Sequence, residues 1–321
     1  QDDEGDPTGP TSFSTTLNVV ASGNNLNYQW YQKPKNVNGP GTLISGATAA
    51  SYTVNIGSGL ENWGLYSYYC AISNNTTKAF VYSNVAEIAL GCGAKTFDGG
   101  WLSFMCYNLG ADSNLSMDEQ MAYSTTLNTD ATVMGDLYQW GRMTDGHEKR
   151  TSERTTTLAT NIEATEPAEV IGKFIADGST EHWLTGISDI GLLNPTMKTS
   201  NDPCPEGWRI PGMQKIFGLV FGDTYYTETL GTHGANTFTW NSTGTHGMKL
   251  STQGTTTLFL PAGGSKDIFR GNLRDVGINC TYRIAFGDEI WKGFFSFTAN
   301  QVRLWESDWA TRAVSMRCMA E

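Results

Sequence analysis

The chain has four histidines, the side chains best suited to exchange a proton or bind a metal ion near neutral pH: His147, His182, His233 and His246. His147 lies in the sequence DGHE with Asp145 and Glu148, and these three side chains could bind a divalent cation. A solvated loop is the favoured interpretation of DGHE, and the metal content stays open. The other three histidines lie in segments that show no arrangement of catalytic or metal-binding partners. The sequence also contains no nucleophile-elbow, zinc-protease, P-loop or dinucleotide-binding motif in the structural context that such a motif requires. The sequence therefore predicts no catalytic residues and no enzyme.

Cysteine is the other reactive side chain, and none of the six forms a CxxC pair or a Cys/His cluster at zinc spacing: Cys70, Cys92, Cys106, Cys204, Cys280 and Cys318. An exported protein in an oxidising environment, with one or two disulfides, fits this pattern better than a metal site.

The composition excludes several classes of protein. With 321 residues, a formal charge of -11 and a pI near 4.8, the chain has no basic face for nucleic acid, and its 21 Lys and Arg residues are scattered. The one dense basic stretch, HEKRTSER at 147–154, contains two glutamates and is interpreted as a solvated loop. No apolar run reaches the roughly 18 residues of a transmembrane helix. Residues 1–9 are acidic and turn-rich, and we expect a tether there, with any secretion signal or lipid anchor upstream.

Residues 10–91 read as short strands bounded by Gly, Asn, Ser or Pro, which predicts a β-sandwich. The alternating segments are SFSTTLNVVAS, LNYQWYQ, ASYTVNI, LYSYYCAIS and KAFVYSNVAEIAL. Across nearly its whole length this half resembles bacterial immunoglobulin-like domains. It departs from them in having no cysteine on its first sheet strand, at Val19 and Val20, and in having Tyr68 where the pattern Asn62, Gly64, Tyr66 would place the second cysteine. Cys70 faces the same side as residue 68, so we expect a buried free thiol.

From residue 92 to the end the composition changes: tryptophans become frequent, and irregular segments of Gly and Asn replace the alternating pattern. Five ordered stretches resemble the Fibrobacter succinogenes major paralogous domain: WLSFMCYNLGAD, DLYQWGRMTDGHE, NDPCPEGWRIPGMQKIF, LFLPAGG and AVSMRCMAE. This family is common in surface and fimbria-associated proteins of Bacteroidetes and is related to C-type lectin-like domains. The resemblance implies an α+β C-type lectin-like domain with long loops over 92–321, in a chain that we expect to be mostly β.

The resemblance also implies a disulfide between Cys204 and Cys318. A second pair, Cys92 with Cys106, lies in motifs that match the opening segment of the family. Cys280 has no obvious partner: it is free, or pairs with Cys70 only if the two domains meet closely. In NDPCPEGWRIP, we expect a turn after the disulfide, Trp208 in the core and a helix over 212–220, so that this stretch is structural.

Sugar binding through calcium is not supported, because the Glu-Pro-Asn and Trp-Asn-Asp motifs of calcium-dependent lectins are missing. No cofactor is expected, although a structural calcium ion could bind at FGDE (286–289) or ESD (306–308). Sulfatase-modifying enzymes share the distant architecture and use reactive cysteines, but the disulfide already accounts for Cys318.

Aromatic side chains on long loops, at 110–200 and 262–312, are candidate ligand contacts, with core packing as the favoured alternative: Trp183, Trp291, Trp305 and Trp309. We therefore expect an extracellular or cell-surface binding protein, an adhesin or a fimbrial accessory or tip subunit. Its partner would be a host or bacterial protein or glycan. The alternative is a structural subunit that contacts other fimbrial or outer-membrane proteins without a host ligand.

Overall fold

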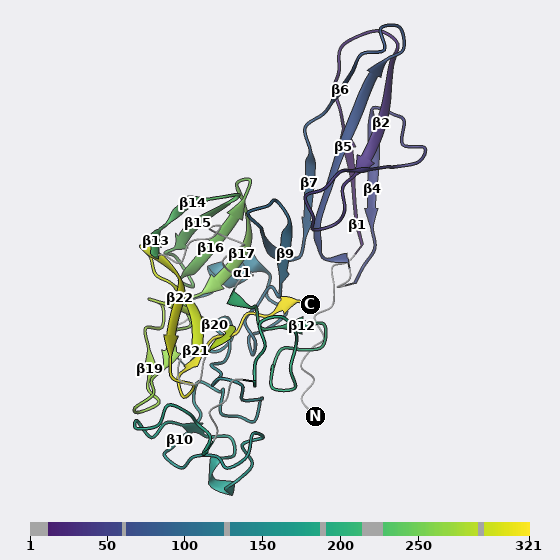
Figure 1. Cartoon of the computed structure of the whole chain (residues 1–321). Coiled ribbons are helices and arrows are strands. Elements are labelled where there is room, and N and C mark those ends of the chain that lie inside the picture. Colours follow the sequence, from purple (N-terminus) through teal and green to yellow (C-terminus); the bar gives the residue numbers. More distant parts are fainter. Residues whose placement is uncertain (1–11, 60–61, 125–128, 187–190, 214–226, 288–291) are drawn as a thin grey trace. The chain divides into compact units, whose positions relative to one another are not determined.

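The computed structural model describes the chain except for residues 1–11, 60–61, 125–128, 187–190, 214–226 and 288–291. The chain forms two compact units, Gln1–Ser103 and Phe104–Glu321 (Figure 1). The predicted boundary at residue 91 lies earlier than this division. The reason is that residues 92–103 bond back to the first unit: the amide of Trp101 donates to the carbonyl of Asn36, at 3.0 Å, and the Asn38 amide donates to the carbonyl of Asp98, at 3.1 Å.

The first unit contains two antiparallel sheets that share one core. One sheet pairs β1 with β4, and the other has the order β3-β2-β5-β6, with β7 also paired to β5. The strands of these sheets are β1 (Phe13–Asn18), β2 (Leu26–Gln32), β3 (Thr42–Leu43), β4 (Ser51–Ile56), β5 (Gly64–Asn74), β6 (Phe80–Tyr82) and β7 (Ala86–Leu90). The next strand, β8 (Cys92–Lys95), belongs to neither sheet. Val54 from the first sheet packs with Trp30 and Ile72 from the second, because alternate residues of each strand face inward. The predicted arrangement of short strands around one core is confirmed.

Trp30 and Cys70 lie opposite each other on β2 and β5, and both are buried. Cys70 is a free thiol, as expected from its place two residues after Tyr68. The hydroxyl of Tyr66 donates to the carbonyl of Asn62, at 2.9 Å, which closes the turn before β5. β5 lies in the centre of its sheet because it pairs with β2, β6 and β7.

The second unit is also mostly β and is built from several small sheets, nearly all of them antiparallel. Its sheet orders are β13-β22-β21-β20, β14-β15-β16-β17 and β19-β18-β23, β24 lies between β12 and β9, and β10 forms a parallel pair with β11. The strands are β9 (Trp101–Phe104), β10 (Arg154–Thr155), β11 (Phe174–Ile175), β12 (Trp208–Arg209), β13 (Thr227–Thr229), β14 (Gly231–His233), β15 (Asn236–Asn241), β16 (Gly247–Thr252), β17 (Thr255–Pro261), β18 (Ser265–Lys266), β19 (Leu273–Arg274), β20 (Cys280–Gly287), β21 (Lys292–Phe297), β22 (Gln301–Asp308), β23 (Ala313–Val314) and β24 (Met319–Ala320). The described chain between β9 and β12 contains little regular structure, and both backbone and side-chain hydrogen bonds hold it, for example from the amide of Tyr138 to the carbonyl of Val314.

Helices contribute little to the described part of the second unit. The helix α1 (Met117–Ala122) begins at Ser116, whose hydroxyl and backbone exchange hydrogen bonds with Glu119 in a capping box. A single 3₁₀ turn, η2 (Ala168–Val170), follows later in the chain. Most of the predicted helix over 212–220 lies outside the described residues. Within the described ranges, no helix combines the length and the apolar character needed to span a bilayer.

The segment 262–312, expected to be a long loop, instead contains five strands, from β18 to β22. Strand β21 shows why the pattern was misleading, because all six of its residues, KGFFSF, are buried. A strand covered on both faces lacks the alternation of polar and apolar residues that identifies a half-exposed strand.

Candidate functional site

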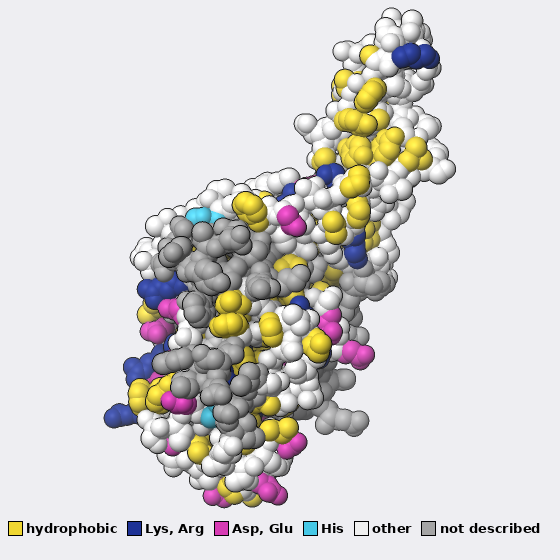
Figure 2. Space-filling model, viewed as in Figure 1, with side chains coloured by type: hydrophobic (Ala, Val, Ile, Leu, Met, Phe, Trp, Pro, Cys, Tyr) yellow, Lys and Arg dark blue, Asp and Glu magenta, His cyan; other side chains and the backbone are white. Residues whose placement is uncertain are grey.

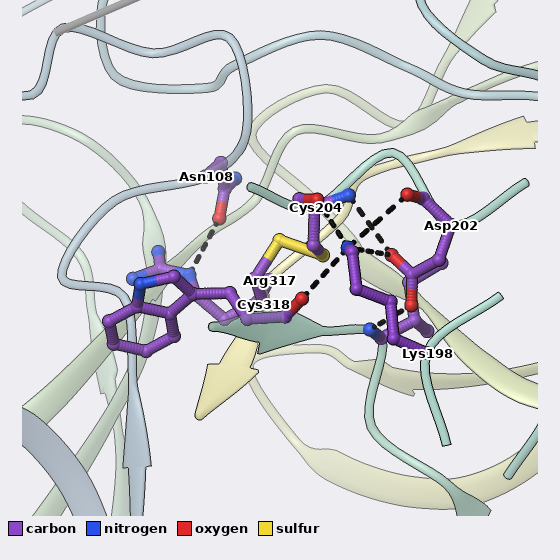
Figure 3. The surroundings of a disulfide bond; sticks show 8 residues. Asn108, Lys198, Asp202, Cys204, Arg317 and Cys318 are labelled. Carbon is purple, nitrogen blue, oxygen red and sulfur yellow. Dashed lines mark hydrogen bonds and ion pairs between the residues drawn. A yellow bond between two sulfur atoms is a disulfide. The ribbon is translucent and has the colours of Figure 1, made fainter. Parts of the chain in front are cut away.

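A disulfide joins Cys204 to Cys318, the pair implied by the resemblance, with Cα atoms 5.8 Å apart (Figure 3). Two charged side chains organise the turn that carries Cys204. The carboxylate of Asp202 accepts from the amides of Cys204 and Ile210, at 3.0 and 2.8 Å. The ammonium of Lys198 donates to the carbonyls of Cys204 and Trp208. The stretch NDPCPEGWRIP therefore has the structural role predicted for it, with Trp208 buried.

The neighbour of this disulfide, Arg317, is fully buried, and its guanidinium crosslinks three segments. It donates to the Asn108 side-chain oxygen at 3.0 Å and to the carbonyls of Met105 and Phe259 at 2.9 Å each. Burial lowers the pKa of Arg317, although Tyr282 and other neighbours oppose this shift. The segment that leads into β24 is thus fixed twice, by the disulfide at Cys318 and by the buried guanidinium of Arg317.

None of the six cysteines is placed as a reactive thiolate. Cys92 and Cys106 are disulfide-bonded, like Cys204 and Cys318. Cys280 is free and fully buried, its thiol donates to the carbonyl of Leu260, and burial raises its pKa far above the ordinary value. A buried thiol with a raised pKa stays protonated and is a poor nucleophile.

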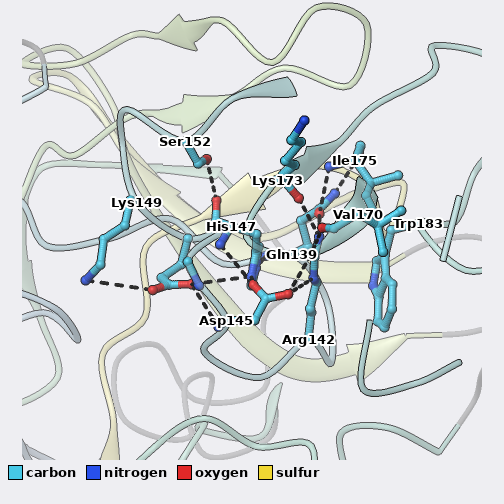
Figure 4. A network of polar contacts seen from close by, with 12 residues as sticks. Gln139, Arg142, Asp145, His147, Lys149, Ser152, Val170, Lys173, Ile175 and Trp183 are labelled. Carbon is cyan, nitrogen blue, oxygen red and sulfur yellow. Dashed lines mark hydrogen bonds and ion pairs between the residues drawn. The ribbon is translucent and has the colours of Figure 1, made fainter. Parts of the chain in front are cut away.

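The DGHE segment is not a solvated loop, because His147 and Glu148 are both fully buried. Figure 4 shows the polar contacts of His147 and Asp145. Nδ1 of His147 lies 2.6 Å from Oδ1 of Asp145, and Nε2 lies 3.2 Å from the backbone nitrogen of Gln139. A backbone N–H can only donate, so Nε2 must accept, and the ring proton must lie on Nδ1 and point to Asp145. The prediction of solvation was wrong because it ignored partners supplied by other segments.

The same carboxylate neutralises a buried arginine. Nη2 and Nε of Arg142 donate to Oδ2 of Asp145, at 2.6 and 3.1 Å. Arg142 also donates to Gln139 and to the carbonyls of Val170 and Lys173, and it is only 1% exposed. One buried cation therefore holds residues 139–145 against residues 170–173.

Ligand atoms of Asp145, His147 and Glu148 lie within 4.8 Å of one another, which is close enough for one cation. Most of their polar atoms already have partners. Nε2 of His147 accepts from Gln139, both oxygens of Asp145 accept from His147 or Arg142, and Oε2 of Glu148 accepts from the amide of Gly146, at 2.9 Å. Oε1 of Glu148 is buried without a hydrogen bond and lies 3.7 Å from the ammonium of Lys149. The cluster is best described as a hydrogen-bond network that orders a loop and leaves one carboxylate oxygen without a hydrogen bond.

We expect the stability of the protein to fall between pH 6.5 and 4 because of His147. Burial lowers its pKa from 6.5 to about 4, and Asp145 opposes this shift only in part. Between these values the unfolded chain binds a proton that the folded chain does not bind. The free energy of unfolding should therefore decrease as the pH falls, by about 3 kcal/mol in total.

Urea titrations at about pH 7 and about pH 4.5 measure this change in the free energy of unfolding, because the two conditions span most of the range between pH 6.5 and 4. The matched variant His147→Gln cannot titrate and should lose most of the difference between the two conditions. Equal pH dependence in the two proteins would contradict a buried, neutral histidine.

The four candidate tryptophans have different outcomes. Trp183 is fully buried, its indole N–H donates to the carbonyl of Trp140 at 2.7 Å, and its ring lies 5.7 Å from the Arg142 guanidinium. It is a core residue, which is the alternative that was favoured for it, and it is not exposed to a ligand at the surface. Trp309 is half-buried and stays a candidate. Trp291 and the side chain of Trp305 lie outside the described part of the chain.

The acidic residues suggested for structural calcium are already paired where they are described. Glu306 accepts from Arg303 at 2.8 Å, and Asp308 accepts from Arg312 at 2.9 Å. Residues 288 and 289 of the FGDE segment lie outside the described ranges.

An exposed aromatic surface on the first unit was not identified from the sequence. It consists of Tyr31, Tyr69, Phe80 and Tyr82 on the outer side of β2, β5 and β6, and is called the aromatic face below. Tyr31 and Tyr69 stack with ring centres 5.1 Å apart, and Tyr82 makes edge contacts with both Tyr69 and Phe80 at 5.6 Å. Phe80 is 62% and Tyr82 60% exposed, and Figure 2 shows hydrophobic side chains gathered at the surface of this unit. The alternation in KAFVYSN predicted the strand, but not which side of it faces solvent.

Comparisons with protein-family models, with curated proteins and with solved structures find no match to this chain.

Proposed function

We propose that this chain is a secreted, cell-surface binding protein in which an immunoglobulin-like unit carries a C-type lectin-like unit. It would act as an adhesin or as a fimbrial accessory or tip subunit, and its partner would be a host or bacterial protein or glycan. The observation that carries this proposal is the aromatic face. Exposed, clustered aromatic side chains are uncommon on a surface that contacts only water, and tyrosine is enriched where proteins bind partners.

Three features of the first unit support the immunoglobulin-like assignment. Its two sheets share one core, the strand of Trp30 lies beside the strand of Cys70, and the Tyr66 hydroxyl bonds to the backbone of Asn62 upstream. A buried tryptophan on a central strand and a tyrosine that closes such a corner are typical of immunoglobulin sandwiches. The inter-sheet disulfide is replaced here by packing around a free thiol.

The disulfides support export. Four of the six cysteines are disulfide-bonded, and such bonds persist mainly in extracellular and periplasmic compartments. The bond from Cys204 to Cys318 and the position of β24 between β12 and β9 agree with the C-type lectin-like assignment. In this proposal the second unit presents its loops on a rigid, crosslinked base.

A structural role in an assembly is the second candidate, and the edge strand β6 favours it. Phe80, Val81 and Tyr82 are all about 60% exposed, so both sides of this strand are apolar. Among the described strands, β6 pairs only with β5, which leaves its other edge open. An open, apolar edge can accept a strand or a face from a neighbouring subunit.

An enzymatic role has less support. Cys318 is oxidised in a structural disulfide, and the nitrogen atoms of His147 are both hydrogen-bonded inside the protein. Neither group is available for nucleophilic or acid-base catalysis in this arrangement.

The proposal is tested by replacing the two most exposed rings of the aromatic face in the source cells. Surface filaments are sheared off and purified, and this protein is quantified in them and in the cell body by mass spectrometry. We expect enrichment in the filaments, and we expect the variant Phe80→Ser/Tyr82→Ser to reduce it by about tenfold or more, because two aromatic anchors are lost.

The matched control is Phe97→Ser, since Phe97 is 67% exposed in the same unit but lies outside the aromatic face. Retention of the wild-type protein in the outer-membrane fraction would contradict the fimbrial assignment and leave a free-standing surface protein. Equal enrichment of the double variant and the wild type would contradict a role for the aromatic face in attachment to the filament.

A further inference from the structure

A pocket of about 200 Å³ in the second unit has no role in the features described so far. It lies where the sheet β19-β18-β23 meets the end of β22, and all of its lining residues belong to the described part of the chain. Its side chains include three carboxylates and two guanidinium groups, which leave one net negative charge. Phe269 adds an apolar wall.

One of the two arginines is anchored to the protein through both ends of its guanidinium fork. Arg312 donates from Nη1 to Asp308 at 2.9 Å and from Nη2 to the hydroxyl of Ser265 at 3.1 Å, and its guanidinium lies 5.0 Å from the ring of Phe294. This ion pair closes one side of the pocket and is held in place by its packing.

The other arginine keeps most of its donors free. Arg274 uses Nε alone, which donates to Asp267 at 3.0 Å, and its side chain is 58% exposed. Asp267 in turn accepts from the amides of Phe269 and Arg270, so its position is set by the hairpin itself. Within the described residues, the two Nη atoms of Arg274 have no acceptor.

The next residue, Asp275, provides an unpaired carboxylate in the same pocket. It has no side-chain partner in the described structure, and it does not pair with the adjacent Arg274. Asp275 has a φ of 57°, and its turn packs tightly over Gly264, where an added Cβ would lie 2.1 Å from the carbonyl oxygen of Arg274. The pocket lining therefore contains a fork of donors at Arg274 and a pair of acceptors at Asp275 that are not paired with each other.

Phe269 borders these polar groups and is 58% exposed. Its ring packs over Gly178, where an added Cβ would lie 3.2 Å from Cδ1 of Phe269. The pocket thus combines a positioned, exposed aromatic ring with unpaired donors and acceptors.

We propose that this pocket binds one sugar ring of a neutral glycan. A vicinal diol both donates and accepts hydrogen bonds, so it can bridge the Arg274 fork and the Asp275 carboxylate, while the C–H face of the ring stacks on Phe269. A volume of about 200 Å³ is below the roughly 300 Å³ at which pockets for drug-sized ligands begin, and suits a single ring. The net negative charge disfavours acidic sugars.

This inference deepens the proposed surface-binding function and rests on it for the availability of extracellular glycans. The test uses the full chain and ligand-detected NMR with methyl glycosides of glucose, galactose and mannose, in the presence of EDTA. We expect at least one glycoside to bind and EDTA to have no effect, because the recognising groups are side chains.

Two variants locate the binding. Asp275→Gly removes the carboxylate and tolerates the positive φ, and Phe269→Ala removes the stacking surface. Each should weaken binding by about tenfold, which corresponds to about 1.4 kcal/mol. The matched control Ile278→Ala, at a residue that is 64% exposed and outside the pocket lining, should bind like the wild type.

The proposal fails if no glycoside binds, if both pocket variants bind like the control, or if sialic acid or free amino acids bind in preference to neutral glycosides. These results are independent of the filament experiment. If no glycoside binds but the protein is enriched in the filaments, only the proposed glycan site is contradicted. If a glycoside binds but the protein is not at the cell surface, only the proposed surface role is contradicted.

Discussion

Replacing Cys204 and Cys318 together by alanine is expected to lower the free energy of unfolding of the second unit by roughly 5 kcal/mol. The two cysteines are 114 residues apart, so their bond removes a large amount of conformational freedom from the unfolded chain. The loss would approach the total stability of an ordinary domain. Urea titration followed by tryptophan fluorescence measures it, because seven of the ten tryptophans lie in this unit.

The matched control is the double variant Cys92→Ala/Cys106→Ala, at the two other bonded cysteines. The resemblance pairs these two cysteines with each other, and a bond that closes such a short loop should contribute less, about 3 kcal/mol. A shift of the urea midpoint for Cys204→Ala/Cys318→Ala no larger than in this control would show that the long-range bond does not dominate the stability of the unit.

The variant Asp145→Ala should destabilise the second unit by about 3 to 5 kcal/mol. It leaves the guanidinium of Arg142 buried without its counterion and removes the acceptor for the ring proton of His147. Burial alone would raise the pKa of Asp145, but His147 and Arg142 lower it below the ordinary value, so the carboxylate is charged at neutral pH. The same urea titration at about pH 7 measures the effect.

Glu153→Ala is the control for this prediction, because it removes an exposed partner of a lysine. Its carboxylate is 82% exposed and lies 3.6 Å from the ammonium of Lys173, so the expected loss is within about 0.5 kcal/mol. If Asp145→Ala cost no more than Glu153→Ala, the buried network would not be what holds residues 139–145 against residues 170–173.

Local pattern was sufficient for the first unit. The strand containing Trp30, the strand containing Cys70 and the burial of that thiol all follow from alternation over five to ten residues. The division between the units was harder to predict, because residues 92–103 have the composition of the second unit but bond to the loop at residues 36–38.

Local pattern was insufficient where both faces of an element are covered. Strand β21 contains no alternation to detect, and the segment 262–312 was therefore interpreted as a loop. Trp183 presents a related difficulty: an aromatic residue in an irregular segment has the same appearance in sequence whether it is at the surface or, as here, packed under Arg142.

By itself the sequence determined the mostly β character, the short strands of the first unit and, through resemblance, the disulfide from Cys204 to Cys318. These features depend on residue type and on spacing over a few positions. Only the tertiary structure decided which charges are buried and which surfaces are available. The buried Arg317 donates to uncharged oxygen acceptors at residues 105, 108 and 259, and the proposed sugar pocket brings Asp275 to Arg312. The free energy of a charge depends on its solvation and on its partners in space, and these partners are supplied by segments that no local window of sequence contains.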